Sequence, residues 1–312
     1  MQWSVRLALV PVALAVVTTA AARPQPRLVL PYDLAVRGGS VYIADGLRHQ
    51  VLRYDLATRR LSVVAGTGRV GTSGDGGPAR RARLTEPTEL VFDRAGSLYF
   101  SDVNQGRVRR IDRRGVITTV ARVPAAAGLS VDPAGRYLAI ASIEGWVYRL
   151  ALPAGRLERL AGDGSDASTG DGGPAAAAKV NGPHDVSYDA RGNLLVTEFS
   201  GVRLIDAGGR IDTLFRRPAF KVVPAADGTF YVLAGSPNGG TVTQVERSGR
   251  VLRVIGTGRL GPHADRVAIN RVGFLPSDVE FAGGALLVTQ TQPVPAIRRL
   301  ARGSRTLTTL VR

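Results

Sequence analysis

From about residue 30 onward, hydrophobic and polar residues alternate in short runs separated by Gly- and Pro-rich turns. An alternation with period two is typical of strands that bury one face. The stretch 87–122, PTELVFDRAGSLYFSDVNQGRVRRIDRRGVITTVAR, contains four such runs joined by short turns. This pattern predicts a four-stranded antiparallel unit.

The unit recurs six times along the chain. Its copies begin near residues 31, 87, 128, 183, 221 and 276. Four strands repeated every ~40 to 55 residues are typical of a propeller blade, and blades stacked around an axis bury faces that a single blade leaves open. We therefore predict an all-β fold: one domain, residues 23–312, that is a six-bladed β-propeller of four-stranded antiparallel blades.

The blades come in pairs, because the links between blades alternate between long and short. The long links share a sequence, GTGRVGTSGDGGPARRARL from Gly66 and GDGSDASTGDGGPAAAAKV from Gly162, with a degraded copy from Gly256. Their paired glycines permit left-handed turns, and we expect a short Ala-rich helix to begin at the following proline. Asp75 and Asp171 are expected to serve as turn or helix-capping groups.

The ring must close between the last blade and the first. Residues 305–311 predict a fourth strand that belongs to the last blade itself. We therefore expect closure by packing of blade faces, assisted by residues 27–30, without exchange of a strand.

The first 22 residues differ from the rest and predict a secretory signal peptide. Arg6 precedes an apolar run from Leu7 to Val17, and Ala20 to Ala22 supply small residues for cleavage. The protein is then secreted, periplasmic or on the cell surface, with no transmembrane span after signal removal. Retention of the segment as an anchor is the alternative. The chain has no cysteine, so no disulfide stabilises it.

The formal charge is +16 at pH 7, and nearly all of the basic residues are arginine. A basic exported protein is expected to adhere weakly to anionic polymers, unless the arginines are scattered and solvated. The segment Arg107–Arg114 could bind phosphates, but strand alternation sends its arginines to opposite faces. Aromatic content is only 6%, which disfavours a nucleic-acid platform built on base stacking.

The repeat resembles the NHL repeat. The matching residues are Pro-x-acid-Leu/Val, Gly-x-Leu-Tyr-Phe-x-Asp, and Arg-Val-Arg-Arg-Ile-Asp-x-x-Gly-x-Ile-x-Thr-Val. The long links resemble those of bacterial NHL proteins and teneurin-like propellers. The resemblance implies a TolB-like six-bladed propeller that serves as a binding platform for protein, RNA or carbohydrate. A minority of related propellers are metal-dependent lactonases or lyases.

One position per blade is expected to form a ring at the mouth of the central channel, because innermost strands begin there. Aligning the six copies on their turn glycine places these residues in the ring: Asp33, Glu89, Gly128, Asp185, Lys221 and Asp278. Carboxylates that converge raise each other's pKa unless a cation compensates. The ring could bind Ca²⁺ through Asp33, Glu89, Asp185 and Asp278, hold a basic or polyol ligand, or bind backbone amides at the strand starts.

A second ring is expected where the second strand of each blade ends. Its members are Asp45, Asp102, Ser142, Glu198, Ala234 and Gln290. The NHL resemblance implies that Asp45 and Asp102 brace neighbouring loops.

Three histidines are present, and His184 is the candidate general base or metal ligand because it adjoins Asp185 at the mouth. His49 is expected in a turn and His263 in a long link. No Gly-x-Ser-x-Gly elbow stands out and no cysteine nucleophile exists.

We therefore expect a monomeric binding or scaffold module for a protein or carbohydrate partner in preference to an enzyme. The alternative is a Ca²⁺-dependent lactonase-like hydrolase or lyase that uses the carboxylate ring, with Ca²⁺ as its cofactor.

Overall fold

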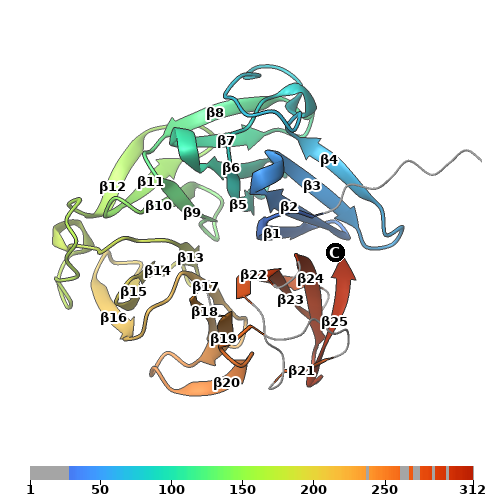
Figure 1. The fold of residues 1–312 in the computed structure, drawn as a ribbon. Helices are drawn as coiled ribbons and strands as arrows, with labels where there is room; N and C mark the ends of the chain where they lie inside the picture. Colours follow the sequence, from blue (N-terminus) through green and yellow to red (C-terminus); the bar gives the residue numbers. More distant parts are fainter. Residues whose placement is uncertain are drawn as a thin grey trace, which may run out of the picture.

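The computed structural model describes residues 28–236, 239–260, 267–269, 275–282, 285–292 and 295–311. Six antiparallel sheets lie around a central axis like the blades of a propeller (Figure 1). The predicted all-β six-bladed fold is confirmed. The predicted signal segment, residues 1–22, and His263 lie outside the described residues.

Each blade contributes four consecutive strands, the first innermost. Blades 1 to 3 consist of β1 Pro31–Arg37, β2 Ser40–Asp45, β3 Gln50–Asp55, β4 Leu61–Ala65; β5 Pro87–Phe92, β6 Leu98–Asp102, β7 Arg107–Ile111, β8 Ile117–Arg122; β9 Ala126–Val131, β10 Tyr137–Ser142, β11 Trp146–Ala151 and β12 Leu157–Gly162. Blades 4 to 6 consist of β13 Val186–Tyr188, β14 Leu194–Glu198, β15 Gly201–Ile205, β16 Ile211–Phe215; β17 Lys221–Pro224, β18 Phe230–Ser236, β19 Gly239–Val245, β20 Val251–Ile255; β22 Leu275–Ala282, β23 Ala285–Gln292, β24 Ala296–Ala301 and β25 Thr306–Val311. A short strand, β21 Val267–Ala268, adds to the outer edge of blade 6.

The up-and-down course of the strands gives the propeller two distinct faces. The link face carries the loops between second and third strands and the links between blades, including residues 66–86 and 163–182. The turn face carries the tight turns inside each blade, such as residues 93–97 and 112–116. Inner strands therefore run from the link face towards the turn face. The two faces meet at the rim of blades 2 and 4, where the Ala79 N–H donates to the Gly115 carbonyl at 2.8 Å and the Ala175 N–H to the Gly209 carbonyl at 2.7 Å.

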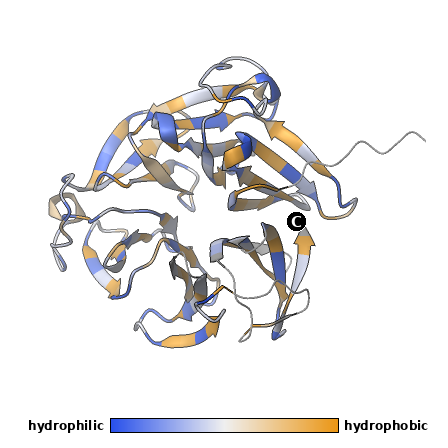
Figure 2. Ribbon diagram, viewed as in Figure 1, coloured by the Kyte–Doolittle hydropathy of each residue, from blue (hydrophilic) through white to orange (hydrophobic). Residues whose placement is uncertain are grey.

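The hydrophobic core lies between neighbouring sheets. Between blades 1 and 2, for example, Ala44 and Val51 pack with Leu90, Phe100 and Ile117, all of them buried. The strands alternate between hydrophobic and hydrophilic residues along their length, as Figure 2 shows. Each blade thus covers one face of its neighbour, and burial of this apolar area is the main force that holds the ring together.

The long links end in single 3₁₀ turns, η2 Ala79–Arg81 and η4 Ala175–Ala177. The left-handed turns are confirmed at Gly76 and Gly172, with φ of 80° and 81°. A short helix follows each proline as expected, in the 3₁₀ form, but capping by Asp75 and Asp171 is wrong. Pro78 and Pro174 precede the turns, no side chain caps either one, and the aspartates of these links bind arginines instead, as described below.

The ring closes as predicted, by packing and not by strand exchange. Strand β25 pairs with β24 of its own blade, and the chain ends beside the first blade (Figure 1). Leu28 is buried in a cluster with Leu287 and Ile297 of blade 6. The Asp278 carboxylate also accepts a 2.8 Å hydrogen bond from the Leu34 N–H of blade 1.

Two further 3₁₀ turns, η1 Gly46–Arg48 and η3 Val103–Gln105, follow the second strands of blades 1 and 2, and His49 caps η1 at φ 55°. His49 therefore has the turn position expected for it. Within the described part of the chain, no helix has the length and hydrophobicity needed to cross a membrane.

Candidate functional site

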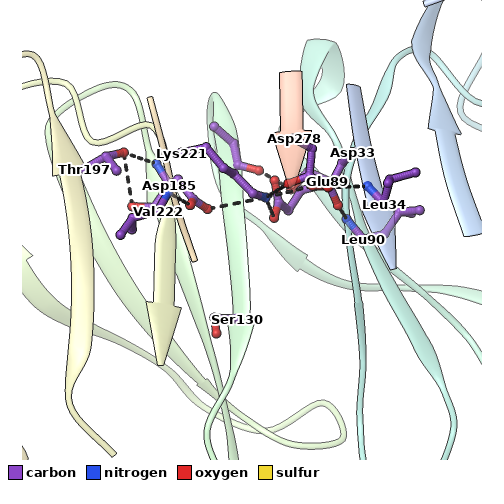
Figure 3. Close-up of polar contacts among 12 residues, drawn as sticks. Asp33, Leu34, Glu89, Leu90, Ser130, Asp185, Thr197, Lys221, Val222 and Asp278 are labelled. Atoms are coloured by element: carbon purple, nitrogen blue, oxygen red, sulfur yellow. Dashed lines mark hydrogen bonds and ion pairs between the residues drawn. The ribbon is translucent and has the colours of Figure 1, made fainter. Parts of the chain in front are cut away.

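Five side chains from five different blades meet on the propeller axis, near the start of the inner strands (Figure 3). The Lys221 ammonium lies at their centre. Its Nζ is 2.5 Å from Glu89 Oε1, 2.7 Å from Asp33 Oδ1, 3.5 Å from Asp278 Oδ1 and 3.8 Å from Asp185 Oδ1. The ring residues selected by aligning the six repeats are therefore brought together, and Lys221 is the cation that the carboxylates share.

The three aspartates of the ring each also bind the next blade around the propeller. A second carboxylate oxygen accepts a backbone N–H in each case: Asp278 from Leu34 at 2.8 Å, Asp33 from Leu90 at 2.7 Å, and Asp185 from Val222 at 2.8 Å. The inner strand is the free edge of each sheet, so such an N–H has no partner strand. Each aspartate thus satisfies an edge donor and joins two blades.

Blade 3 has no side chain in the ring. A Cβ placed on Gly128 would lie 2.5 Å from the Asp185 Cα and 2.8 Å from the Val186 nitrogen of the next blade. Glycine is therefore required by the close approach of two inner strands. Ser130, two residues further along, makes the contact between these blades instead, because its Oγ accepts the Tyr188 N–H at 3.0 Å.

Burial and the repulsion between neighbouring carboxylates raise the pKa values of three carboxyl groups in the ring. Burial and the neighbouring Asp33 charge hold the pKa of Glu89 well above its usual range, and the pKa of Asp278 is raised for the same two reasons. Burial raises the pKa of Asp185 from 3.8 to about 6. Burial opposes the charge of Lys221, but the carboxylates around it raise its pKa well above the ordinary value. Lysine therefore stays charged while the carboxyl groups share protons.

This arrangement limits the chemistry open to the ring. The lysine ammonium occupies the point at which the Ca²⁺ hypothesis places the metal. Among the residues that the structure describes, no group of three or more His, Asp or Glu side chains has the geometry to hold a metal ion. The contacts favour a structural junction of five blades.

A cavity of about 250 Å³ extends from the ring along the inner strands. Glu89, Asp185 and Lys221 border one part of it, and Ser187 and Glu280 line it further along. The central channel is thus a polar recess with the ring on its border.

His184 does not join the ring chemistry. Its imidazole packs edge-on against Phe199, with ring centroids 4.6 Å apart. Burial lowers the pKa of His184, which favours the neutral form. Its place beside Asp185 in the sequence does not bring it to the central ammonium, because adjacent residues of an extended chain point to opposite sides.

The second ring braces loops. Asp45 accepts the N–H groups of Val29 and Leu30 at 2.9 and 2.8 Å, and Asp102 accepts those of Thr85 and Glu86 at 2.8 and 2.7 Å. Each aspartate fixes the segment that enters its own blade. The other described polar members bind locally: Ser142 to the Pro124 carbonyl, Glu198 to Arg203, and Gln290 to Arg298.

Sequence reasoning missed a set of buried arginines in the third strands of alternate blades. Arg109, Arg203 and Arg298 are at most 1% exposed. Arg109 pairs with Asp75 at 2.6 Å, and Arg203 pairs with Asp171 at 2.7 Å. These ion pairs hold the two long links onto blades 2 and 4. Their signal was the repetition of Arg in the third strand and of Asp in the links at the same two-blade period.

The arginines of strand β7 are therefore not available to bind phosphate. Arg109 is buried beneath the link, Arg107 donates to the Thr72 carbonyl at 2.8 Å, and Arg110 donates to Ser97 Oγ at 2.9 Å. All three guanidinium groups already have partners within the protein.

Comparison with known proteins agrees with this architecture. The family model described as the teneurin NHL domain matches residues 32–134. Teneurin-1 of Caenorhabditis elegans is 28% identical over 152 residues, which cover 42% of this chain and 5% of that protein. Mouse teneurin-1 is 40% identical over 93 residues, covering 26% of this chain and 3% of that protein. The protein SUPPRESSOR OF QUENCHING 1 of Arabidopsis thaliana is 33% identical over 79 residues, 25% of this chain and 7% of that protein. The chain thus spans less than a tenth of these relatives.

Solved structures share the fold at low sequence identity. A chain of the nidogen/laminin complex superposes with a TM-score of 0.63 at 13% identity, covering 87% of this chain and 93% of that one. The virginiamycin B lyase of Staphylococcus aureus superposes with a TM-score of 0.59 at 15% identity, covering 90% and 84%. At this identity the likeness concerns the fold alone.

Proposed function

Because the chain folds as a six-bladed propeller and residues 32–134 match the teneurin NHL domain, we propose that it is a binding module that holds a protein partner on its link face. The proposal includes export of the protein, for which the first 22 residues are the support.

The observation that carries the proposal is the distribution of exposed apolar side chains. Ten large hydrophobic residues are markedly exposed in the described part of the chain. Six of them lie on the link face: Val29, Leu47, Val70, Ile143, Phe199 and Leu260. Val70, Leu47 and Phe199 are 62%, 59% and 55% exposed. The link face therefore presents more exposed apolar side chains than the turn face, and apolar side chains are what the core of a protein interface buries.

The rest of the described surface has fewer exposed large hydrophobic residues. On the turn face, Leu56 is the single large hydrophobic residue with comparable exposure among the described residues. The other three, Val251, Leu252 and Val254, lie on β20 at the rim of blade 5. The ring supports a binding role over the lactonase-like alternative, because its carboxylates are engaged by Lys221 and by backbone amides.

A substitution series tests this proposal. The variant Leu47→Ser, Val70→Ser, Phe199→Ser should lose a partner that the wild-type protein captures by cross-linking in extracellular and envelope fractions of its source. The matched control is Val251→Ser, Leu252→Ser, Val254→Ser, which removes three exposed apolar side chains from β20 and should keep the partner. Equal capture by both variants would overturn the proposal. So would turnover of a lactone by the purified protein that a chelator abolishes.

A further inference from the structure

The turns on the turn face are rich in exposed arginine. Thirteen arginines of these turns are exposed: Arg59, Arg60, Arg94, Arg113, Arg114, Arg136, Arg156, Arg191, Arg210, Arg247, Arg250, Arg302 and Arg305. The same turns contain seven carboxylates: Asp93, Asp112, Asp132, Asp189, Asp206, Asp227 and Glu246. Thirteen arginines against seven carboxylates leave the described turns with a formal charge of +6.

Most of these carboxylates are directed at the backbone. Asp112 Oδ1 accepts the N–H groups of Arg114 and Val116, both at 2.9 Å. Asp93 is buried and accepts the Ser97 N–H at 2.8 Å. Such aspartates stabilise the turns and do little to cover the guanidinium groups that project from them.

Ion pairing divides the thirteen arginines by position in the ring. Five pair with carboxylates, and all five lie on blades 3, 4 and 5: Arg136, Arg156, Arg210, Arg247 and Arg250. The other eight have no ion pair within the residues that the structure describes. Seven of those eight lie on the adjacent blades 6, 1 and 2, and we call this set the arginine arc: Arg302, Arg305, Arg59, Arg60, Arg94, Arg113 and Arg114.

The arc is continuous across the boundary between blades 1 and 2. Arg37 of blade 1 reaches over this boundary and donates to the Asp93 carbonyl at 2.9 Å. A Cβ added to Gly96 would lie 2.9 Å from Arg37 Nη2 and 3.1 Å from Arg113 Nε. Guanidinium groups from two blades therefore flank one glycine turn.

We propose that the arginine arc binds an acidic polysaccharide. Guanidinium groups pair with carboxylates in a bidentate geometry, and a polymer with an acid on each repeat can contact several arginines at once. None of the arc residues is among the exposed apolar residues of the link face, so this proposal does not depend on the protein partner proposed above.

The structure favours a polysaccharide over two other polyanions. Binding of single-stranded nucleic acid uses open aromatic faces, whereas Phe92 and Tyr137 near the turns are covered by Arg37 and Arg149, with guanidinium carbons 5.2 and 4.6 Å from the ring centroids. A membrane surface fits less well because peripheral membrane binding combines basic residues with apolar side chains that insert, and Leu56 is the single large hydrophobic residue with marked exposure in the described turns of this face.

The arc also borders a recess of suitable size. A groove of about 650 Å³ lies between blades 5 and 6 and is lined by Arg302 of the arc together with Arg253 and Tyr231. Asp227 lines it too, with its Oδ1 accepting the Thr229 N–H and hydroxyl. Sites for small ligands commonly measure ~300 to 1,000 Å³. The groove can receive a sugar of a chain that runs along the arc.

Binding to polygalacturonate fragments tests the proposal. The variant Arg59→Gln, Arg60→Gln, Arg113→Gln, Arg114→Gln should lower the affinity of the wild-type protein by at least about tenfold, because four charge-assisted contacts are lost. The matched control removes four exposed charges from the link face, Arg69→Gln, Arg83→Gln, Arg217→Gln, Arg259→Gln, and should bind as the wild type does. Thermal unfolding of both variants should match the wild type, since the replaced side chains are exposed.

Several outcomes would overturn the proposal that the arginine arc binds an acidic polysaccharide. One is an equal loss in both variants, which would reflect net charge alone, and another is no binding by the wild-type protein. Tighter binding of duplex DNA or of vesicles containing anionic lipid than of the polysaccharide would assign the surface to those ligands instead. The arc variant should still capture the protein partner of the link face, so failure of one proposal is separable from failure of the other.

Discussion

At the scale of single residues, Lys221 is a nearly buried charge surrounded by other buried charges. It is 9% exposed and faces four carboxylates, so the ring would carry a charge of −3 if every group were ionised. Raised pKa values of Glu89, Asp185 and Asp278 show how this charge is reduced. The ring consequently binds protons when the protein folds.

Folding stability should therefore depend on Glu89. Its pKa is held above the unfolded value chiefly by burial, so the folded state binds the additional proton and loses stability as pH rises through the folded pKa. The neutral variant Glu89→Gln removes that proton exchange and still offers an oxygen to Lys221. We expect its free energy of unfolding to fall less steeply than that of the wild type between about pH 5 and pH 8, and to exceed it by about 1 kcal/mol at the upper limit.

Urea unfolding across this range measures the effect. The control is Glu158→Gln, because the pKa of Glu158 is lowered by its hydrogen bond with Arg149 and the group has already ionised below this range. Its pH dependence should parallel the wild type. A Glu89→Gln variant with an unchanged pH slope would show that Glu89 does not carry a raised pKa.

The ring residues could be predicted from the sequence because a repeat places equivalent positions around one axis. Aligning the turn glycines was enough to select Asp33, Glu89, Asp185, Lys221 and Asp278. Which oxygen binds which donor could not be predicted. Contacts such as that of Lys221 with Asp33 join residues 188 positions apart and depend on the small gaps between blades.

At the scale of elements, the long links depend on buried arginines. Arg203 of β15 binds Asp171 at 2.7 Å, Ser168 Oγ at 3.0 Å and Glu198 at 3.3 Å, and its side chain is 2% exposed. The link is also held by the buried Val180 and by backbone hydrogen bonds such as that from the Gly172 N–H to the Ile211 carbonyl at 2.9 Å, and the guanidinium adds a buried ion pair to these contacts. The sequence showed the link and its turn glycines but not this anchor, because an arginine in an alternating strand is ordinarily exposed.

Replacing the anchor should loosen one link and destabilise the fold. Arg203→Gln leaves the fully buried Glu198 without its cation, and we expect a loss of about 3 to 5 kcal/mol in the free energy of unfolding. Hydrogen exchange in residues 163–182 should become faster than in the equivalent link 66–86. Arg210→Gln, at an exposed ion pair with Asp212, is the control and should cost less than about 1 kcal/mol. Unchanged exchange in residues 163–182 would exclude the anchoring role.

At the scale of the whole molecule, the sequence predicted the blade number, the two-blade period and the closure of the ring. These follow from periodicity and from the burial that each sheet needs. The distribution of charge and apolar surface could not be predicted, because it depends on which turns and links share a face and on which arginines find partners. The folded propeller has most of its described exposed apolar side chains on the link face, an arginine-rich turn face, and a ring of carboxylates at its axis that Lys221 joins.

The role of that ring is the central claim, and thermal unfolding of the wild type and of Lys221→Met tests it most directly. Met keeps the length and volume of the side chain but leaves the buried carboxylates without a cation. We expect the wild-type Tm to be the same in Ca²⁺ and in EDTA, and the variant Tm to be about 10 °C lower and partly restored by Ca²⁺. A wild-type protein that EDTA destabilises, or a variant as stable as the wild type, would contradict a ring held together by its lysine.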